Sequence, residues 1–298
     1  MNDLTRVNNG TDRPPALETH QSWWGMIGIG ENGVEWSMEQ KLERIAAAGF
    51  TGILGRLPEP RDREQWHRLL SDYKLSFGIH SFPSSRADLE SLLKEAKDFG
   101  VAYVNSQVMG NMLRDEAAVQ LLQDLLGAAA ETGIPYFVET HRGRITQDLL
   151  RTVDYVNQLP HLRLTIDISH YVLSCEVSSP SMAAELNPAL DVLLQRTSSI
   201  HGRVSSGQQI QADIGEAEHP MASPFAAWWK QGMSCWLQGA QPGDVLPFVS
   251  ELGPPPYAIV QGPDGTGPEI SDRWQQALVL KRLAEQAWHE VTLQSGME

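Results

Sequence analysis

The sequence has few cysteines and no long hydrophobic run, and both absences narrow the class of protein. Cys175 and Cys235 are the only cysteines among 298 residues and form no CxxC pair, which favours free thiols in a reducing compartment. No run of about 18 apolar residues occurs, so we expect no membrane span. Residues 1–20 lack the apolar centre of a signal peptide. We therefore expect a soluble cytoplasmic protein.

Basic residues are also scarce, with 23 Lys and Arg against 37 Asp and Glu and a formal net charge of −14. An acidic chain repels nucleic acid and anionic membranes, so neither is an expected partner. Hydrophobic residues make up 41% of the chain and charged residues 20%, which is ordinary for a globular protein with a large core.

Apolar runs of strand length alternate with segments of helical periodicity along most of the chain. Serines that can cap helices (Ser37 and Ser85) and glycines that can end them (Gly100 and Gly133) bound several helical segments. We predict strands at 23–29, 50–54, 75–80, 101–105, 136–139, 164–167, 199–201 and 245–251. We predict helices at 38–48, 61–73, 85–99, 115–132, 146–159, 181–197, 224–232 and 271–291.

Eight strands that alternate with helices predict a closed parallel barrel, so the expected fold class is α/β with a single (β/α)₈ TIM barrel. The segment 205–244 is an enlarged loop after the seventh strand and holds the helix at 224–232. We expect one domain over residues 22–298. Residues 1–21 are expected to form a disordered or loosely attached tail.

Four of the predicted strands end in side chains that bind metal ions: Glu139, Asp167, His201 and Glu251. Charged residues avoid burial unless they are paired or bound to a metal, and the chemistry of this fold lies at the carboxyl ends of the strands. Three carboxylates and one imidazole favour one divalent ion (Mn, Co, Zn or Mg) over Ca. Glu139 and Glu251 lie on separate strands, so each can exchange a proton with a bound sugar or polyol.

The series Glu139, Asp167 with His170 three residues later, His201 and Glu251 resembles the xylose-isomerase-like barrel superfamily. This superfamily contains sugar isomerases, sugar epimerases and type-IV-like endonucleases, and the resemblance covers roughly residues 23–291. It implies that the four strand-end side chains bind the metal, and that in a ketose 3-epimerase the two glutamates also exchange the substrate proton. It further implies that His170 and a basic residue after His201, here Arg203, contact substrate oxygens.

Other polar residues near the predicted strand ends have alternative interpretations. His80 ends the third strand and either lines the pocket or is a structural histidine. His141 either faces inward with Glu139 or supports the neighbouring helix. Both are candidate substrate-binding residues. Arg142 is expected in a salt bridge at the rim.

The sequence therefore predicts a metal-dependent sugar isomerase or epimerase that transfers a proton at a carbon next to a carbonyl. A lyase or dehydratase acting on a keto-inositol or 3-keto-sugar would use the same residues. A non-catalytic sugar-binding barrel is a third reading, and a DNA endonuclease is disfavoured by the acidic charge. The chain is a possible homo-oligomer.

Overall fold

The computed structural model describes residues 4–262 and 267–296, and within these ranges eight parallel strands close into a barrel. The strand order is β2-β5-β6-β7-β8-β9-β10-β11, and pairing of β11 with β2 closes the ring. The barrel strands are β2 Ala16–Ser22, β5 Gly52–Gly55, β6 Ser76–Ser81, β7 Tyr103–Ser106, β8 Tyr136–Glu139, β9 Leu164–Ile166, β10 Thr197–Gly202 and β11 Asp244–Ser250. The (β/α)₈ fold expected from the sequence is confirmed.

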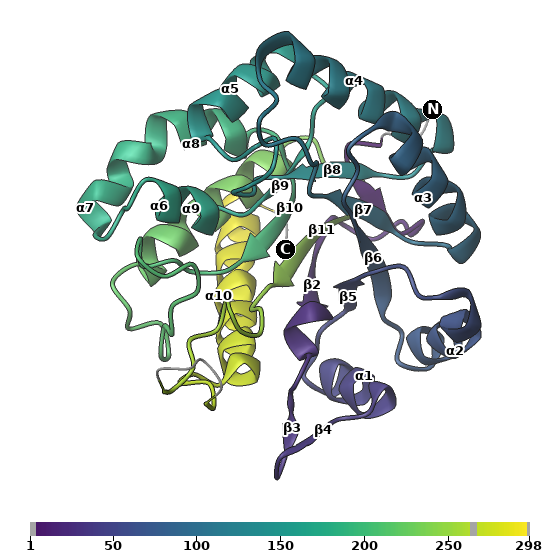
Figure 1. Ribbon diagram of the computed structural model, residues 1–298, viewed down its shortest axis with the longest axis vertical. Coiled ribbons are helices and arrows are strands. Elements are labelled where there is room, and N and C mark those ends of the chain that lie inside the picture. Colours follow the sequence, from purple (N-terminus) through teal and green to yellow (C-terminus); the bar gives the residue numbers. More distant parts are fainter. Residues whose placement is uncertain (1–3, 263–266, 297–298) are drawn as a thin grey trace.

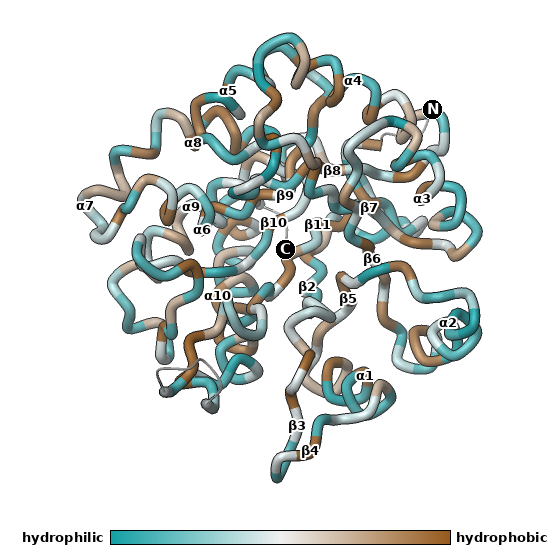
Figure 2. The backbone as a smooth tube through the Cα atoms, viewed as in Figure 1, coloured by the Kyte–Doolittle hydropathy of each residue, from teal (hydrophilic) through white to brown (hydrophobic). Residues whose placement is uncertain are grey.

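Helices surround the barrel on its outside (Figure 1). They are α1 Met38–Ala47, α2 Arg63–Asp72, α3 Arg86–Phe99, α4 Asp115–Thr132, α5 Leu149–Gln158, α6 Ser169–Ser174, α7 Pro180–Ala183, α8 Asn187–Leu194, α9 Ala222–Leu237 and α10 Arg273–Gln294. They carry both hydrophilic and hydrophobic segments (Figure 2), as expected for helices that pack one face against a sheet. No helix in the described ranges is both long and apolar enough to span a membrane.

Local sequence signals explain several helix ends. Ser37 forms a capping box with Gln40 at the start of α1, and the Ser85 side chain accepts a hydrogen bond from the Asp88 amide at the start of α3. Gly100 and Gly133 follow α3 and α4 with φ of 81° and 76°, a conformation that favours glycine. These four positions are the caps and stops that the sequence predicts.

The predicted first strand is wrong. The barrel begins with β2, Ala16–Ser22, inside the segment expected to be a loose tail, whereas Trp24–Met26 forms a 3₁₀ turn. The short strand β1, Val7–Asn8, also pairs with β11. The polar residues of β2 conceal the strand from the sequence pattern, and backbone pairing with β11 on one side and β5 on the other holds the segment in the sheet. Tertiary pairing thus overrides the higher strand propensity of the two tryptophans.

Three further segments differ from the predictions. The helix expected at 181–197 is divided into α7, the 3₁₀ turn Ala184–Leu186 and α8, and Pro188 lies in the first turn of α8. Helix α9 is longer than the predicted 224–232, because Trp228, Trp229 and Trp236 are buried along it. Helix α6 follows directly after Asp167 and was not predicted.

A polar network at the amino-terminal end of the barrel centres on Glu18 of β2. The Glu18 carboxylate lies 3.1 Å from His20 Nε2 and accepts a hydrogen bond of 2.8 Å from the Ser76 hydroxyl. Burial raises the pKa of Glu18, but the contacts with His20 and Ser76 outweigh burial and lower it. Because the pKa is lower in the folded state, the ionised carboxylate stabilises the fold.

Glu18→Gln is expected to lower the free energy of unfolding at pH 7 by roughly 1 to 2 kcal/mol. The stabilisation by Glu18 is present above the ordinary carboxyl pKa and is lost as the pH falls through the lower pKa of the folded state. The difference between wild type and variant should therefore shrink below about pH 4.3. Urea unfolding at pH 7, 5 and 4 measures it. Glu43→Gln, at an exposed position of α1, is the control, and a Glu18 effect that does not change with pH would contradict the prediction.

Candidate metal centre

The structure brings the four predicted metal ligands together at the carboxyl ends of adjacent strands. Glu139 is the last residue of β8, Asp167 follows β9, His201 lies in β10 and Glu251 follows β11. All four side chains are buried. Each offers one ligand atom, and these atoms all lie within 4.8 Å of one another. Because neighbouring parallel strands end at the same edge, the barrel alone accounts for this convergence.

The distances within this four-residue cluster suit a single ion. His201 Nδ1 lies 3.0 Å from Glu251 Oε2 and 3.8 Å from Glu139 Oε1. Two ligand atoms that each bind one metal ion at roughly 2.1 Å, with a right angle between the two bonds, lie roughly 3 Å apart. Asp167 Oδ2 and His201 Nε2 are buried and form no hydrogen bond with the described residues. Buried polar atoms without partners are costly, and a bound cation would satisfy the Asp167 oxygen.

The charge of the cluster also fits a divalent ion. Three carboxylates and the guanidinium of Arg203 leave a formal charge of −2. Burial raises the pKa of Glu139 to about 7, helped by the charges of Glu251 and Asp167 and opposed by His201. Burial lowers the pKa of His201, but the carboxylates of Glu251 and Glu139 outweigh it and raise the pKa to about 9. The raised pKa values show that the cluster favours added positive charge, and one divalent cation would supply it in place of protons.

Glu251 differs from Glu139 because it is surrounded by positive charge. Burial raises the pKa of the Glu251 carboxyl, but His201 and Arg203 outweigh burial and hold the pKa below its ordinary range. Arg203 Nη2 donates to Glu251 Oε2, and Arg203 Nε donates to the Glu251 carbonyl at 2.8 Å. Two carboxylates with pKa values pushed apart are the arrangement that acid/base catalysis uses.

Arg203 is 1% exposed, which is unusual for an arginine and requires compensating partners. Besides its bonds to Glu251, its Nη1 lies 3.4 Å from Asp167 Oδ2. The Tyr257 ring covers the guanidinium at 5.0 Å. Arg203 therefore fixes two of the candidate ligands, and it also lines the cavity that reaches the cluster.

The sequence did not single out two amides that hold Glu139. Asn105, in β7, donates to Glu139 Oε2 at 2.6 Å, and Gln107 donates to Glu139 Oε1 at 3.2 Å. Arg144 in turn donates to Gln107 Oε1 at 3.1 Å. The polar run Asn105-Ser-Gln at the end of an apolar strand was a usable signal, because it repeats the pattern seen at Glu139.

The two histidines that follow Glu139 and Asp167 lie close together but contact different groups. The rings of His141 and His170 are 3.8 Å apart. His170 is fully buried, with Nδ1 3.1 Å from Arg142 Nη1 and Nε2 3.5 Å from Asp167 Oδ2. Burial, reinforced by His141 and the neighbouring arginines, holds the pKa of His170 well below its ordinary value. A neutral His170 can accept from Arg142 at Nδ1, and its Nε2 lies 3.4 Å from Arg203 Nη1.

Arg142 does not form the expected rim salt bridge, since no carboxylate among the described residues pairs with it. It contacts His170 and stacks on Tyr257 at 4.8 Å. Tyr257 lies 3.4 Å from His141 Nε2 through its hydroxyl. The sequence did not identify Tyr257, because it lies in an irregular segment after β11 that has no periodic pattern.

A cavity of about 670 Å³ reaches this cluster, and both His80 and His141 line it together with Arg203 and Glu251. His80 Nε2 lies 3.8 Å from Glu251 Oε1. Burial lowers the pKa of His80 to about 4 and that of His141 to about 3, so both are neutral near pH 7. Neutral imidazoles can donate to or accept from substrate hydroxyls.

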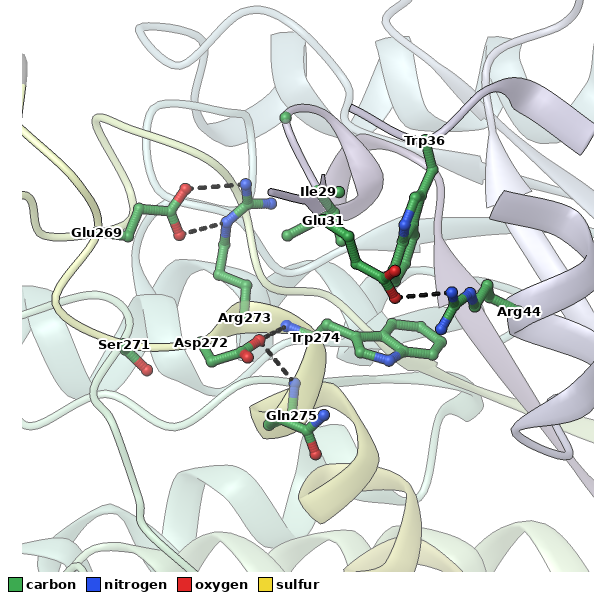
Figure 3. Close-up of a pocket in the computed structure, with 12 residues that line it drawn as sticks. Ile29, Glu31, Trp36, Arg44, Glu269, Ser271, Asp272, Arg273, Trp274 and Gln275 are labelled. Carbon is green, nitrogen blue, oxygen red and sulfur yellow. Dashed lines mark hydrogen bonds and ion pairs between the residues drawn. The ribbon is translucent and has the colours of Figure 1, made fainter. Parts of the chain in front are cut away.

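Another cavity, of about 440 Å³, lies between the β3–β4 hairpin (Gly30–Glu31 and Val34–Glu35) and the start of α10 (Figure 3). Its charged side chains already have partners. Arg44 contacts Glu31 at 2.7 Å, Arg273 contacts Glu269 at 2.6 Å, and Asp272 accepts from the backbone amides of Trp274 and Gln275 at the start of α10. Since these groups are already bound to one another or to the backbone, this cavity is a weaker candidate for a site that binds a polar substrate.

Comparison with known families and structures gives one family and one fold. The model of the xylose isomerase-like TIM barrel family matches residues 42–201, which include Glu139, Asp167 and His201. No curated protein matches the chain. The structure is similar to that of an L-ribulose 3-epimerase, with 13% identity, 94% of this chain and 97% of that chain covered, and a TM-score of 0.57. A family 2 AP endonuclease from Brucella melitensis matches with 14% identity, 77% and 92% coverage and a TM-score of 0.49.

Proposed function

The chain belongs to the xylose isomerase-like TIM barrel family, and we propose that it is a divalent-metal-dependent sugar isomerase or epimerase. The observation that carries this proposal is the buried cluster of Glu139, Asp167, His201 and Glu251 at the end of an open cavity. Three buried carboxylates beside one buried arginine leave an excess of negative charge, and burial of uncompensated charge destabilises a fold. The similarity to the L-ribulose 3-epimerase structure supports the same class of reaction.

The four cluster residues would hold the metal, and His80, His141, His170 and Arg203 would bind or orient the sugar. A metal bound there would polarise a carbonyl oxygen of the sugar and so acidify the neighbouring C–H group. Arg203 adds a fixed positive charge beside the same position and can donate to a substrate oxygen. The reaction is then a proton transfer at a carbon next to a carbonyl.

Glu251 is suited to remove the proton and Glu139 to return one. Arg203 donates to the Glu251 carboxylate and favours its ionised form, so Glu251 is available as a base. Glu139 has a raised pKa, near 7, and is held by Asn105 and Gln107. A carboxyl group whose pKa lies near 7 can either donate or accept a proton during turnover. Glu139 ends β8 and Glu251 follows β11, and β9 and β10 lie between these two strands. The two glutamates can therefore reach two faces of a bound sugar.

Chelation of the metal is the first test of this proposal. Purified protein should contain Mn, Co, Zn or Mg, and a panel of ketoses and aldoses in deuterated water should show enzyme-dependent incorporation of deuterium at carbon. EDTA should lower the exchange rate at least tenfold, and added metal should restore it. Metal content is measured by mass spectrometry and deuterium by NMR on the same samples.

Two results would contradict the proposal. Protein that binds no metal even after supplementation would exclude the cluster as a metal centre. Metal-bound protein that changes a sugar while keeping its carbon-bound hydrogen would exclude proton transfer and favour a hydride shift. Loss of an oxygen substituent from a keto-sugar, alongside deuterium incorporation, would instead identify the lyase reaction.

A further inference from the structure

The cavity that reaches the metal cluster has two chemically different sets of lining residues. Polar side chains from β6 and from the loops after β7, β8, β10 and β11 line one part, and they include His80, Gln107, His141, Arg203 and Glu251. Apolar side chains that follow β2, β5 and β6 line another part. This apolar set consists of Trp23, Trp24, Ile27, Leu57, Trp66 and Phe82. The division follows the barrel, since the metal ligands come from β8 to β11 and the apolar set from the first three strands.

The apolar set forms a fixed surface with exposed apolar edges. Trp23 and Trp66 pack edge to face with ring centres 4.9 Å apart, and Trp66 is buried in α2. Ile27 is 50% exposed and Phe82 is 40% exposed. Single exposed apolar side chains are ordinary on a protein surface, but several that line one cavity indicate a surface for an apolar ligand group.

Few polar groups accompany this apolar set. Among the described residues of the cavity, the segment after β5 supplies Arg56 and Glu59, and both are exposed. A second sugar ring bound here would lose water from its hydroxyls and find few hydrogen-bond partners in return, which weakens binding. A planar apolar ring has no such requirement and gains from stacking on aromatic side chains.

The size of the cavity also indicates a ligand with an apolar group in addition to the sugar. At about 670 Å³, it lies in the middle of the range of roughly 300 to 1,000 Å³ for sites that bind drug-sized ligands. A ligand of that size is larger than one sugar ring. The part of the ligand beyond the sugar would lie against the apolar set, because the polar set and the cluster account for the sugar.

We propose that the substrate is a keto-sugar joined to an aromatic group, as in an aryl glycoside that carries a carbonyl on its sugar ring, and that Trp23, Ile27, Leu57 and Phe82 bind the aromatic group. This inference rests on the proposed function, which places the sugar ring at the metal cluster. The aromatic group packs against the residues after β2, β5 and β6 and contributes affinity without taking part in proton transfer.

The test compares phenyl and methyl glycosides of the same set of common sugars, with dissociation constants measured by calorimetry. At least one phenyl glycoside should bind roughly tenfold more tightly than its methyl partner, because its ring buries additional apolar surface. The double variant Ile27→Ala, Phe82→Ala should lose most of this advantage. Ile270→Ala is the matched control, because Ile270 is 54% exposed and lines a different cavity.

Equal binding of every phenyl and methyl pair, or no binding of any phenyl glycoside, would overturn the proposal. So would tighter binding of cellobiose than of phenyl glucoside, which would assign the apolar set to a second sugar ring. The ratio of phenyl to methyl affinity requires no turnover, so it judges the apolar set independently of the metal-dependent reaction. Circular dichroism of each variant, with an unchanged melting temperature, ensures that a lost ratio reports binding and not unfolding.

Discussion

Glu251→Gln is expected to slow sugar-dependent exchange of carbon-bound hydrogen by roughly 10² to 10⁴-fold, the usual contribution of a positioned base. The amide has nearly the shape of the carboxylate but cannot take up a proton. In the wild type, Arg203 donates to the Glu251 carboxylate and favours its ionised form, which makes it the more suitable base of the two glutamates. The measurement is deuterium incorporation into the sugar at saturating metal.

Metal content has to be read on the same samples, because Glu251 is also a candidate metal ligand. Asp167→Asn is the matched control, since it changes a ligand to which no proton transfer is assigned. At saturating metal, Asp167→Asn should regain most of its exchange activity, whereas Glu251→Gln should stay slow with metal bound. If Glu251→Gln binds metal and exchanges hydrogen at the wild-type rate, Glu251 is not the base.

Arg203→Met is expected to lower the free energy of unfolding of the metal-free protein by a large amount. Arg203 is buried between Asp167 and Glu251, so its removal takes a positive partner away from two buried carboxylates. Loss of one member of a buried ion pair costs about 3 to 5 kcal/mol of unfolding free energy. Added Mn²⁺ should restore a large part of this loss, because the cation offsets the same carboxylates. Urea unfolding in EDTA and in Mn²⁺ measures both values.

Arg273→Met provides the comparison for Arg203→Met. Arg273 is 3% exposed and donates to the carbonyl of Ile27 at 2.7 Å and to the Glu269 carboxylate. Neither partner belongs to the four-residue cluster. Loss of the Arg273 side chain should lower the free energy of unfolding by the same amount in EDTA and in Mn²⁺. If metal restores both variants equally, or if Arg203→Met is as stable as wild type in EDTA, the electrostatic account of Arg203 is wrong.

These two predictions depend on different contacts, so they test different parts of the proposal. Glu251→Gln tests the proton transfer at fixed metal content, whereas Arg203→Met tests how buried charge in the cluster is balanced. A protein with a structural ion-pair cluster and no enzymatic activity would show the second effect without the first. A result of that kind would retain the barrel and its metal centre and remove the assigned chemistry.

The sequence alone determined the barrel and the four residues of the cluster. Helix periodicity and capping residues such as Ser37 and Ser85 are local, so they can be read without the structure. The candidate ligands could be predicted because each one directly ends an apolar strand, and parallel strands in a barrel end at one edge. Once eight strands are recognised, the position of a residue along its strand predicts its place in the site.

The tertiary structure decided the parts that depend on partners distant in the chain. The polar segment Ala16–Ser22 becomes a strand only because β11 and β5 offer it hydrogen bonds on both sides. Asn105 belongs to the site because its amide meets Glu139 across a strand pair, and Tyr257 because an irregular segment returns over Arg203. The apolar part of the cavity joins Ile27, Leu57 and Phe82 from three separate loops. Apart from Asn105, which ends an apolar strand, these residues carry no local pattern, since only packing in three dimensions brings their side chains together.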